Sequence, residues 1–135
     1  QVYSPTMRSV SVSTLTENIV EVAECVELNR LDNFIVVAHS YGAMVMTGLL
    51  QNYSDKIQQM VFIDSAVPKN GCSLFGLFER HGYSYNDLGL TPDPACMEKI
   101  EFDEGLLISQ KKTYIHCLQS ELFKNNRYFL SGNKG

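Results

Sequence analysis

Ser40 is the residue whose surroundings most clearly suggest chemistry. The residues two before, two after and three after it are all small, namely Ala38, Gly42 and Ala43. This spacing is typical of a nucleophile elbow, a sharp turn that crowds these three positions and holds the serine oxygen clear of the backbone. We therefore predict that Ser40 is a nucleophile and that the backbone N–H of Tyr41 donates to an oxyanion.

The residues on either side of Ser40 favour this interpretation. Phe34 to Val37 form a short apolar run after a Leu31-Asp32-Asn33 turn, which predicts a buried strand. Apolar or small residues then recur at spacings of three and four, which predicts a helix with one buried face; they are Met44, Val45, Gly48 and Leu49. The alternative is an ordinary strand, turn and helix in which the serine is incidental.

Further elements are expected before and after this segment. Thr14 and Glu17 form the ends of a capping-box pattern, which predicts the start of a helix. A turn is expected at Asn52 to Asp55, and the next apolar run, Met60 to Ile63, is expected to form a second strand that ends at Asp64. A third strand is expected over Thr113 to Leu118.

Helices that alternate with strands indicate an α/β fold with a mostly parallel sheet and flanking helices. The carboxyl ends of parallel strands meet at one edge, where ligands bind in such sheets. We therefore expect Ser40, Asp64 and the residues after Leu118 to gather there.

Three stretches resemble the α/β-hydrolase superfamily, closest to the branch of plant methylesterases, hydroxynitrile lyases and small bacterial esterases. They are residues 37–45, residues 60–68 with 71–74, and residues 112–117. The resemblance covers roughly residues 9 to 130 and implies a partial α/β-hydrolase fold in one domain, residues 1–135. It implies a cap at residues 70–109, between the family's sixth and seventh strands, and the chain looks like an internal fragment.

The resemblance leaves two candidates for the catalytic acid. In this branch the acid follows the seventh strand, where this chain has Ser120, so Glu121 could serve if the loop shifts by one residue. Some α/β-hydrolases place the acid after the sixth strand, which corresponds to Asp64. The alternative for Asp64 is a turn cap.

No histidine occupies the family's position for the general base. His39 adjoins the nucleophile and is interpreted as a structural turn residue. His81 falls in the expected cap, and His116 is expected to be a core residue of the third strand. A base supplied from outside these positions is therefore required if Ser40 is to be activated.

The resemblance implies a serine hydrolase of the carboxylesterase type that acts on a small, largely apolar ester. An apolar patch in the expected cap would suit such a substrate, or could simply pack the cap onto the core; it comprises Leu74, Phe75, Leu77 and Phe78. Two other functions remain open. One is a non-catalytic binding or interaction protein with a hydrolase-like fold, and the other is a cofactor-free lyase similar to the hydroxynitrile lyases.

Composition limits the partners. With 11 basic and 15 acidic residues the formal charge is −4, so neither nucleic acid nor an anionic membrane is an expected partner. The cysteines show no metal-ligand spacing and indicate reduced thiols in a cytoplasmic protein; they are Cys25, Cys72, Cys96 and Cys117. We expect no cofactor, no metal and no membrane span. A truncated sheet would leave edges or apolar faces bare, so an oligomer or poor solubility is expected.

Overall fold

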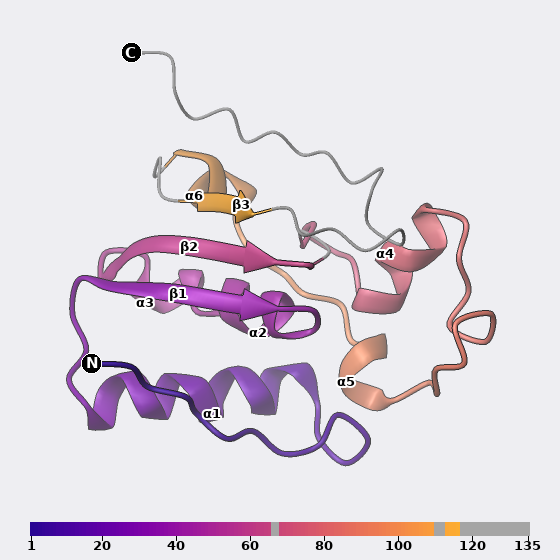
Figure 1. Cartoon of the computed structure of the whole chain (residues 1–135), viewed down its shortest axis with the longest axis horizontal. Coiled ribbons are helices and arrows are strands. Elements are labelled where there is room, and N and C mark those ends of the chain that lie inside the picture. Colours follow the sequence, from indigo (N-terminus) through magenta and orange to yellow (C-terminus); the bar gives the residue numbers. More distant parts are fainter. Residues whose placement is uncertain (66–67, 110–112, 117–135) are drawn as a thin grey trace.

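Helices and strands alternate along the chain, as the sequence predicted for an α/β protein. The computed structural model describes residues 1–65, 68–109 and 113–116 (Figure 1). The elements follow in the order α1 (Leu15–Leu28), β1 (Phe34–His39), α2 (Gly42–Gly48), α3 (Leu50–Tyr53), β2 (Ile57–Ile63), α4 (Leu74–Arg80), α5 (Pro94–Met97), α6 (Glu104–Ser109) and β3 (Thr113–His116).

The described strands form a parallel sheet in the order β1-β2-β3. His39 pairs with Ile63, and Ile63 pairs with His116, so the three strands end at the same level. The mostly parallel sheet predicted from the sequence is therefore confirmed. Of the predicted third strand, Cys117 and Leu118 lie outside the described residues.

The predicted turn between α2 and β2 needs a correction. Asn52 and Tyr53 are not part of a turn, because they end the short helix α3. β2 then begins at Ile57, earlier than the apolar run that predicted it. Ile57 is only 1% exposed and pairs with Phe34, so burial and strand pairing extend β2 through the polar residues that follow Ile57.

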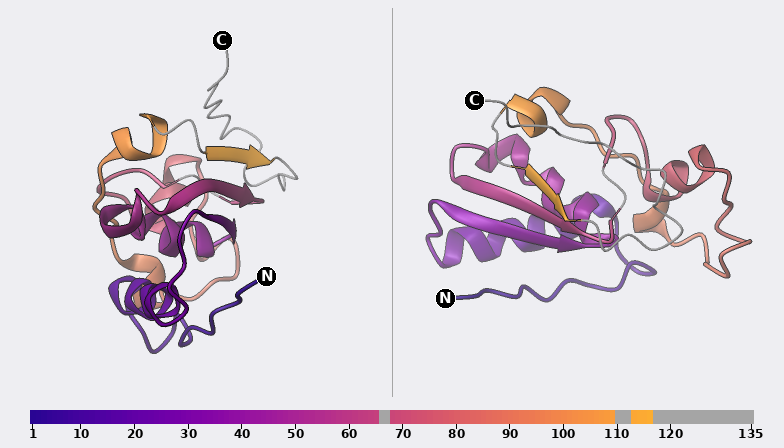
Figure 2. Two further views of the ribbon diagram at one scale, coloured as in Figure 1. Left: turned by 90° about the vertical axis from the view of Figure 1, so that its left-hand side faces the viewer. Right: turned by 45° about the horizontal axis from the view of Figure 1, so that its top comes forward.

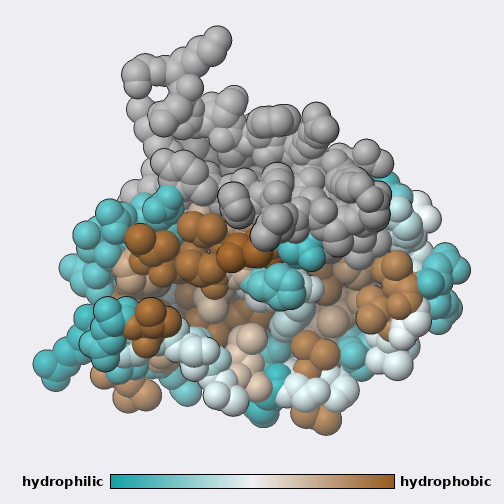
Figure 3. All heavy atoms as spheres, in the orientation of Figure 1, coloured by the Kyte–Doolittle hydropathy of each residue, from teal (hydrophilic) through white to brown (hydrophobic). Residues whose placement is uncertain are grey.

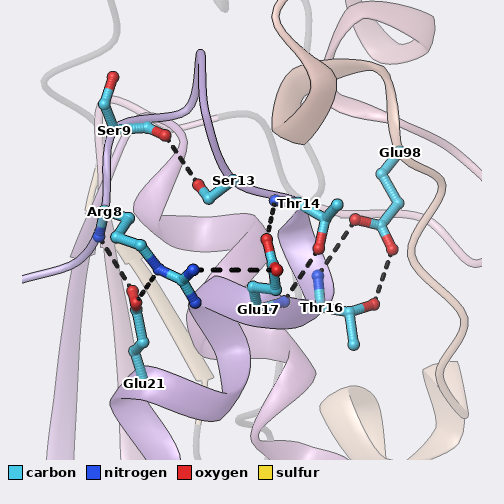
Figure 4. Close-up of polar contacts among 8 residues, drawn as sticks. All are labelled: Arg8, Ser9, Ser13, Thr14, Thr16, Glu17, Glu21 and Glu98. Carbon is cyan, nitrogen blue, oxygen red and sulfur yellow. Dashed lines mark hydrogen bonds and ion pairs between the residues drawn. The ribbon is translucent and has the colours of Figure 1, made fainter.

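The start of α1 is fixed by polar contacts (Figure 4). The Thr14 hydroxyl oxygen accepts from the Glu17 N–H at 3.1 Å, and the Glu17 carboxylate accepts from the Thr14 N–H at 2.8 Å. This is the predicted capping box. The Glu98 carboxylate accepts from the N–H and the hydroxyl of Thr16, at 3.1 and 2.6 Å. These bonds join the segment after α5 to the first turn of α1.

One face of the sheet carries the core. α2 and α3 lie behind β1 and β2 in Figure 1, and both views of Figure 2 place them on that side. Alternate side chains of the strands point into this layer and are almost fully buried. The core there includes Val36, Ala38, Met44, Val45, Leu49, Met60 and Phe62.

The opposite face of the sheet is apolar and partly open. Ile35 and Val37 of β1 are 52% and 57% exposed, and Figure 3 shows apolar side chains gathered over β1 and β2 on the face turned to the viewer. The prediction that the whole run from Phe34 to Val37 is buried was therefore wrong. Side chains alternate along a strand, and no helix among the described residues covers this face.

Most of the segment expected to form a cap lies beyond the carboxyl ends of the strands, but its last helix, α6, returns to the side of the sheet where β3 begins. Figures 1 and 2 show α4 and α5 past the arrowheads of β1 and β2. The four apolar side chains of α4 named above are at most 5% exposed and belong to the same core cluster as the sheet. Phe75 also stacks on Tyr85, with ring centroids 5.2 Å apart. This burial favours the alternative in which these side chains pack the segment onto the core.

Candidate active site

Ser40 lies in the turn between β1 and α2 with a left-handed backbone, at φ 51°. Few residues other than glycine adopt this conformation, because the Cβ atom then crowds the backbone at a cost of about 1 to 2 kcal/mol. Such strain gathers at functional sites. The strand, left-handed serine and helix are the backbone features that a nucleophile elbow requires. The catalytic role of Ser40 stays a prediction.

The steric argument for small residues around Ser40 holds at two positions and is wrong at the third. Ala38 and Ala43 are 3% and 0% exposed, so larger side chains would not fit there. A Cβ atom added to Gly42, in contrast, would meet no described atom within 4 Å. Gly42 is therefore not crowded in the described part of the chain, because that side of the turn faces open space.

Asp64 follows the end of β2 as Ser40 follows the end of β1. The preceding residues, His39 and Ile63, are paired across the two parallel strands, so Ser40 and Asp64 are neighbours at the carboxyl edge of the sheet. Asp64 also has a left-handed backbone, at φ 42°. The structure thus brings the predicted nucleophile and one predicted acid to adjacent strand ends, both in a strained conformation.

Ser65 supports this edge and was not identified from the sequence. Its side chain is buried, at 3% exposure, and its hydroxyl donates to the Ile63 carbonyl at 2.8 Å. A longer contact of 3.4 Å reaches the carbonyl of Ala38, two residues before Ser40. Ser65 therefore links the end of β2 to the residues that lead into the turn. A serine after a strand is too common to have signalled this role.

Tyr41, the predicted oxyanion donor, is held through its side chain. Its hydroxyl accepts a hydrogen bond from the Asn18 side-chain amide of α1 at 2.8 Å. Burial raises the pKa of Tyr41 to about 12, so the phenol is neutral at physiological pH. Sequence reasoning did not identify Asn18. A signal was present, because Asn18 is a polar residue between Leu15 and Val22 on the buried face of α1.

The other residues considered for the site, Glu121, Ser120 and the three histidines, have no described place in it. Glu121 and Ser120 lie outside the described residues. His39 is an exposed strand residue, His81 follows α4, and the backbone of His116 ends β3 at the level of Ile63. The described part of the chain therefore contains the predicted nucleophile, the predicted oxyanion donor and one predicted acid, and none of its histidines is predicted to be the general base.

Two negative findings concern the described residues alone. They contain no group of three or more histidine, cysteine or acidic side chains placed to hold a metal ion. None of their helices combines the length and the apolar character needed to cross a membrane.

The three cysteines that the structure describes, Cys25, Cys72 and Cys96, are free thiols.

Comparison with known families agrees with the fold. The sequence profile described as alpha/beta hydrolase fold matches residues 5–83, more than half of the chain. The chain therefore belongs to the alpha/beta hydrolase fold family, and the resemblance seen in the sequence is confirmed.

One curated relative and one solved structure are also similar to this chain. Over 67 residues the chain is 42% identical to the carbendazim hydrolyzing esterase of Nocardioides sp. (strain SG-4G), covering 50% of this chain and 28% of the esterase. A solved structure, an extracellular alpha/beta-hydrolase from a Paenibacillus species, is similar with a TM-score of 0.56 and 20% identity. Its title reports structural and functional homology to tobacco Salicylic Acid Binding Protein 2. The match covers 80% of this chain and 59% of that one, and at this identity it shows the fold alone.

Proposed function

We propose that this protein is a serine hydrolase of the carboxylesterase type. Ser40 attacks the carbonyl carbon of an ester, and the backbone N–H of Tyr41 binds the oxyanion that forms. The observation that carries the proposal is the left-handed Ser40 between β1 and α2, beside a left-handed Asp64 at the end of the neighbouring strand. Membership of the family and the esterase relative support it.

Asp64 is the acid that the described residues favour. A serine hydroxyl is a weak nucleophile until a histidine takes its proton, and a carboxylate orients that histidine and stabilises its charged form. The position of Asp64 next to Ser40 at the sheet edge suits this role. Glu121 stays an alternative, since it lies outside the described residues.

A small, largely apolar ester is the proposed substrate. After α4, beyond the strand ends where Ser40 lies, the chain carries tyrosine rings that are not fully buried, namely Tyr83 and Tyr85. The esterase relative is named for the hydrolysis of carbendazim. The reaction needs no cofactor, since the serine and its base supply the bond-forming steps.

The test is intact mass after treatment with a fluorophosphonate probe, which modifies activated serines. Three chains are compared, namely the wild type, Ser40→Ala, and Ser54→Ala as a control at a partly exposed serine after α3. We expect one adduct on the wild type and on the control, and none on Ser40→Ala. A folded wild type that gains no adduct, or an adduct that persists in Ser40→Ala, contradicts the proposal.

A non-catalytic binding protein is the second candidate. The observation that favours it is the lack of an assigned base among the described residues, together with the serine at position 120 in the sequence. This candidate predicts a folded chain that the probe does not label, but that still binds small esters in a calorimetric titration. A labelled Ser40 would exclude it.

A further inference from the structure

Asn18 is a polar residue in an apolar environment. It is 0% exposed and lies on the face of α1 that packs into the core, between Leu15 and Val22. Burying an amide costs free energy unless it is hydrogen-bonded. Among the described residues its Nδ2 has one partner, the Tyr41 hydroxyl, while its Oδ1 has none. An apolar residue would suit this position better if packing were its sole role.

The bond from Asn18 reaches the residue directly after the proposed nucleophile. Tyr41 is the N-cap of α2 and has a helical backbone, at φ −56° and ψ −29°. Its side chain has only two rotatable bonds before the rigid ring, so a fixed hydroxyl restricts the position of the Tyr41 backbone. That backbone carries the N–H proposed to bind the oxyanion.

The next residue of α1 holds the other end of α2. A Cβ atom built on Gly48, the last residue of α2, would lie 2.3 Å from the Ile19 side chain, so the two helices are in close contact there. Consecutive residues, Asn18 and Ile19, therefore contact opposite ends of α2. Because the capping box and the bonds to Glu98 fix the start of α1, these contacts set where the turn at Ser40 lies.

We propose that Asn18 is a positioning residue of the active site, which holds the Tyr41 hydroxyl and thereby fixes the Tyr41 N–H for the oxyanion. This inference rests on the proposed function of Ser40. Asn18 acts through Tyr41 and does not touch the substrate. No proton is transferred in this role, because the buried phenol stays neutral and serves as a hydrogen-bond acceptor.

The test uses Asn18→Leu, which replaces the amide by an apolar group of similar size, and Tyr41→Phe, which removes the hydroxyl alone. The double variant shows whether the two act through one bond. Thr47→Val is the matched control. Thr47 is also 0% exposed, and its hydroxyl has no hydrogen-bond partner among the described residues. Thr47 lies on α2, and its hydroxyl makes no hydrogen bond to the Tyr41 hydroxyl.

The first readout is the second-order rate of labelling by the fluorophosphonate probe. Loss of one oxyanion donor typically slows such reactions about 100-fold to 1,000-fold. A donor that is displaced but not lost should therefore lower the labelling rate by about 10-fold to 100-fold. We expect this loss in Asn18→Leu and in Tyr41→Phe, no further loss in the double variant, and no loss in Thr47→Val. Wild-type rates in both single variants, or losses that multiply in the double variant, would overturn the inference.

The second readout does not depend on activity. In protein labelled with ¹⁵N-tyrosine, the amide signal of Tyr41 is assigned by its loss in Tyr41→Phe. Asn18→Leu should change the chemical shift of this signal more than it changes the shifts of the other six tyrosines. Thr47→Val should not change the Tyr41 shift in this way. An unmoved Tyr41 signal overturns the inference even if Ser40 is never labelled. A moved signal in a protein whose wild type is not labelled supports the positioning contact and contradicts only the proposed hydrolase activity.

Discussion

The close contact between α1 and α2 makes Gly48→Ala a demanding test of the structure. Gly48 is buried, and a Cβ atom there would lie 2.3 Å from Cδ1, 2.6 Å from Cγ1 and 3.2 Å from Cγ2 of Ile19. Cβ atoms in proteins do not approach other atoms below about 3 Å, and here two atoms of the Ile19 side chain lie below that distance. Ile19 must therefore change its rotamer, or the two helices must separate.

The expected size of the effect follows from two opposing contributions. Overpacking a core position costs about 1 to 3 kcal/mol. Alanine recovers up to about 1 kcal/mol relative to glycine within a helix, and less at the last residue of α2. Because Ile19 is only partly buried, part of the strain can be relieved, so we expect a net loss of about 1 to 2 kcal/mol. A urea titration followed by circular dichroism measures this loss, which corresponds to a Tm lower by about 3 to 8 °C.

Two further variants identify the cause. In an Ile19→Ala background the obstructing side chain is absent, so adding Gly48→Ala should be neutral or slightly stabilising. Gly42→Ala is the matched control at the other end of α2, because a Cβ atom there meets no described atom within 4 Å. If Gly48→Ala is as stable as the wild type, or destabilises the Ile19→Ala background by the same amount, the close contact does not exist.

Three other substitutions test the backbone and the polar contacts, each by urea titration. Ser40→Gly should be more stable than Ser40→Ala by about 1 kcal/mol, since both lack the hydroxyl but only glycine accepts φ 51° without strain. Thr14→Ala should lose about 1 kcal/mol, because it breaks the capping box with Glu17. Arg8→Ala should lower stability more at pH 7 than at pH 2. Hydrogen bonds from the Arg8 backbone and side chain lower the pKa of Glu21 below its ordinary 4.5, and the variant removes the side-chain bond while it keeps the backbone N–H. That stabilisation is complete above pH 4.5 and is lost as the pH falls through the lowered pKa.

Each of these predictions can fail in a recognisable way. Equal stabilities of Ser40→Gly and Ser40→Ala would mean that the turn is not left-handed at this residue. A Thr14→Ala variant as stable as the wild type would mean that solvent replaces the cap at no cost. An Arg8→Ala effect of the same size at pH 7 and pH 2 would show that it does not arise from the ionised form of Glu21.

Local sequence signals predicted the local structure well. The capping-box pattern at Thr14 and Glu17 predicted the start of α1, and the structure contains both of its hydrogen bonds. The apolar spacing after Ser40 predicted α2, whose residues from Ala43 to Val45 are buried. Both signals depend on residues within one or two helical turns, so they can be interpreted without knowledge of the rest of the fold.

Features that depend on distant residues could not be predicted in this way. An apolar run such as Phe34 to Val37 looks the same whether one or both faces of its strand are covered, so the exposure of Ile35 and Val37 was not foreseen. The bond between Asn18 and Tyr41 joins residues 23 positions apart and depends on how two helices pack. Glu121 remains a prediction, since it lies outside the described residues, and the sequence analysis named no residue as the base.

The orientation of the turn at Ser40 therefore depends on α1 as much as on its own motif. The part of the Gly48→Ala strain that a new Ile19 rotamer does not relieve pushes α2 away from α1. Because α2 is a short rigid element, its other end at Tyr41 should then move relative to Asn18. Thr14→Ala weakens the start of α1 without adding bulk between the helices. At equal loss of stability, Gly48→Ala should therefore slow labelling of Ser40 more than Thr14→Ala does. Equal labelling rates would mean that the turn keeps its geometry independently of α1.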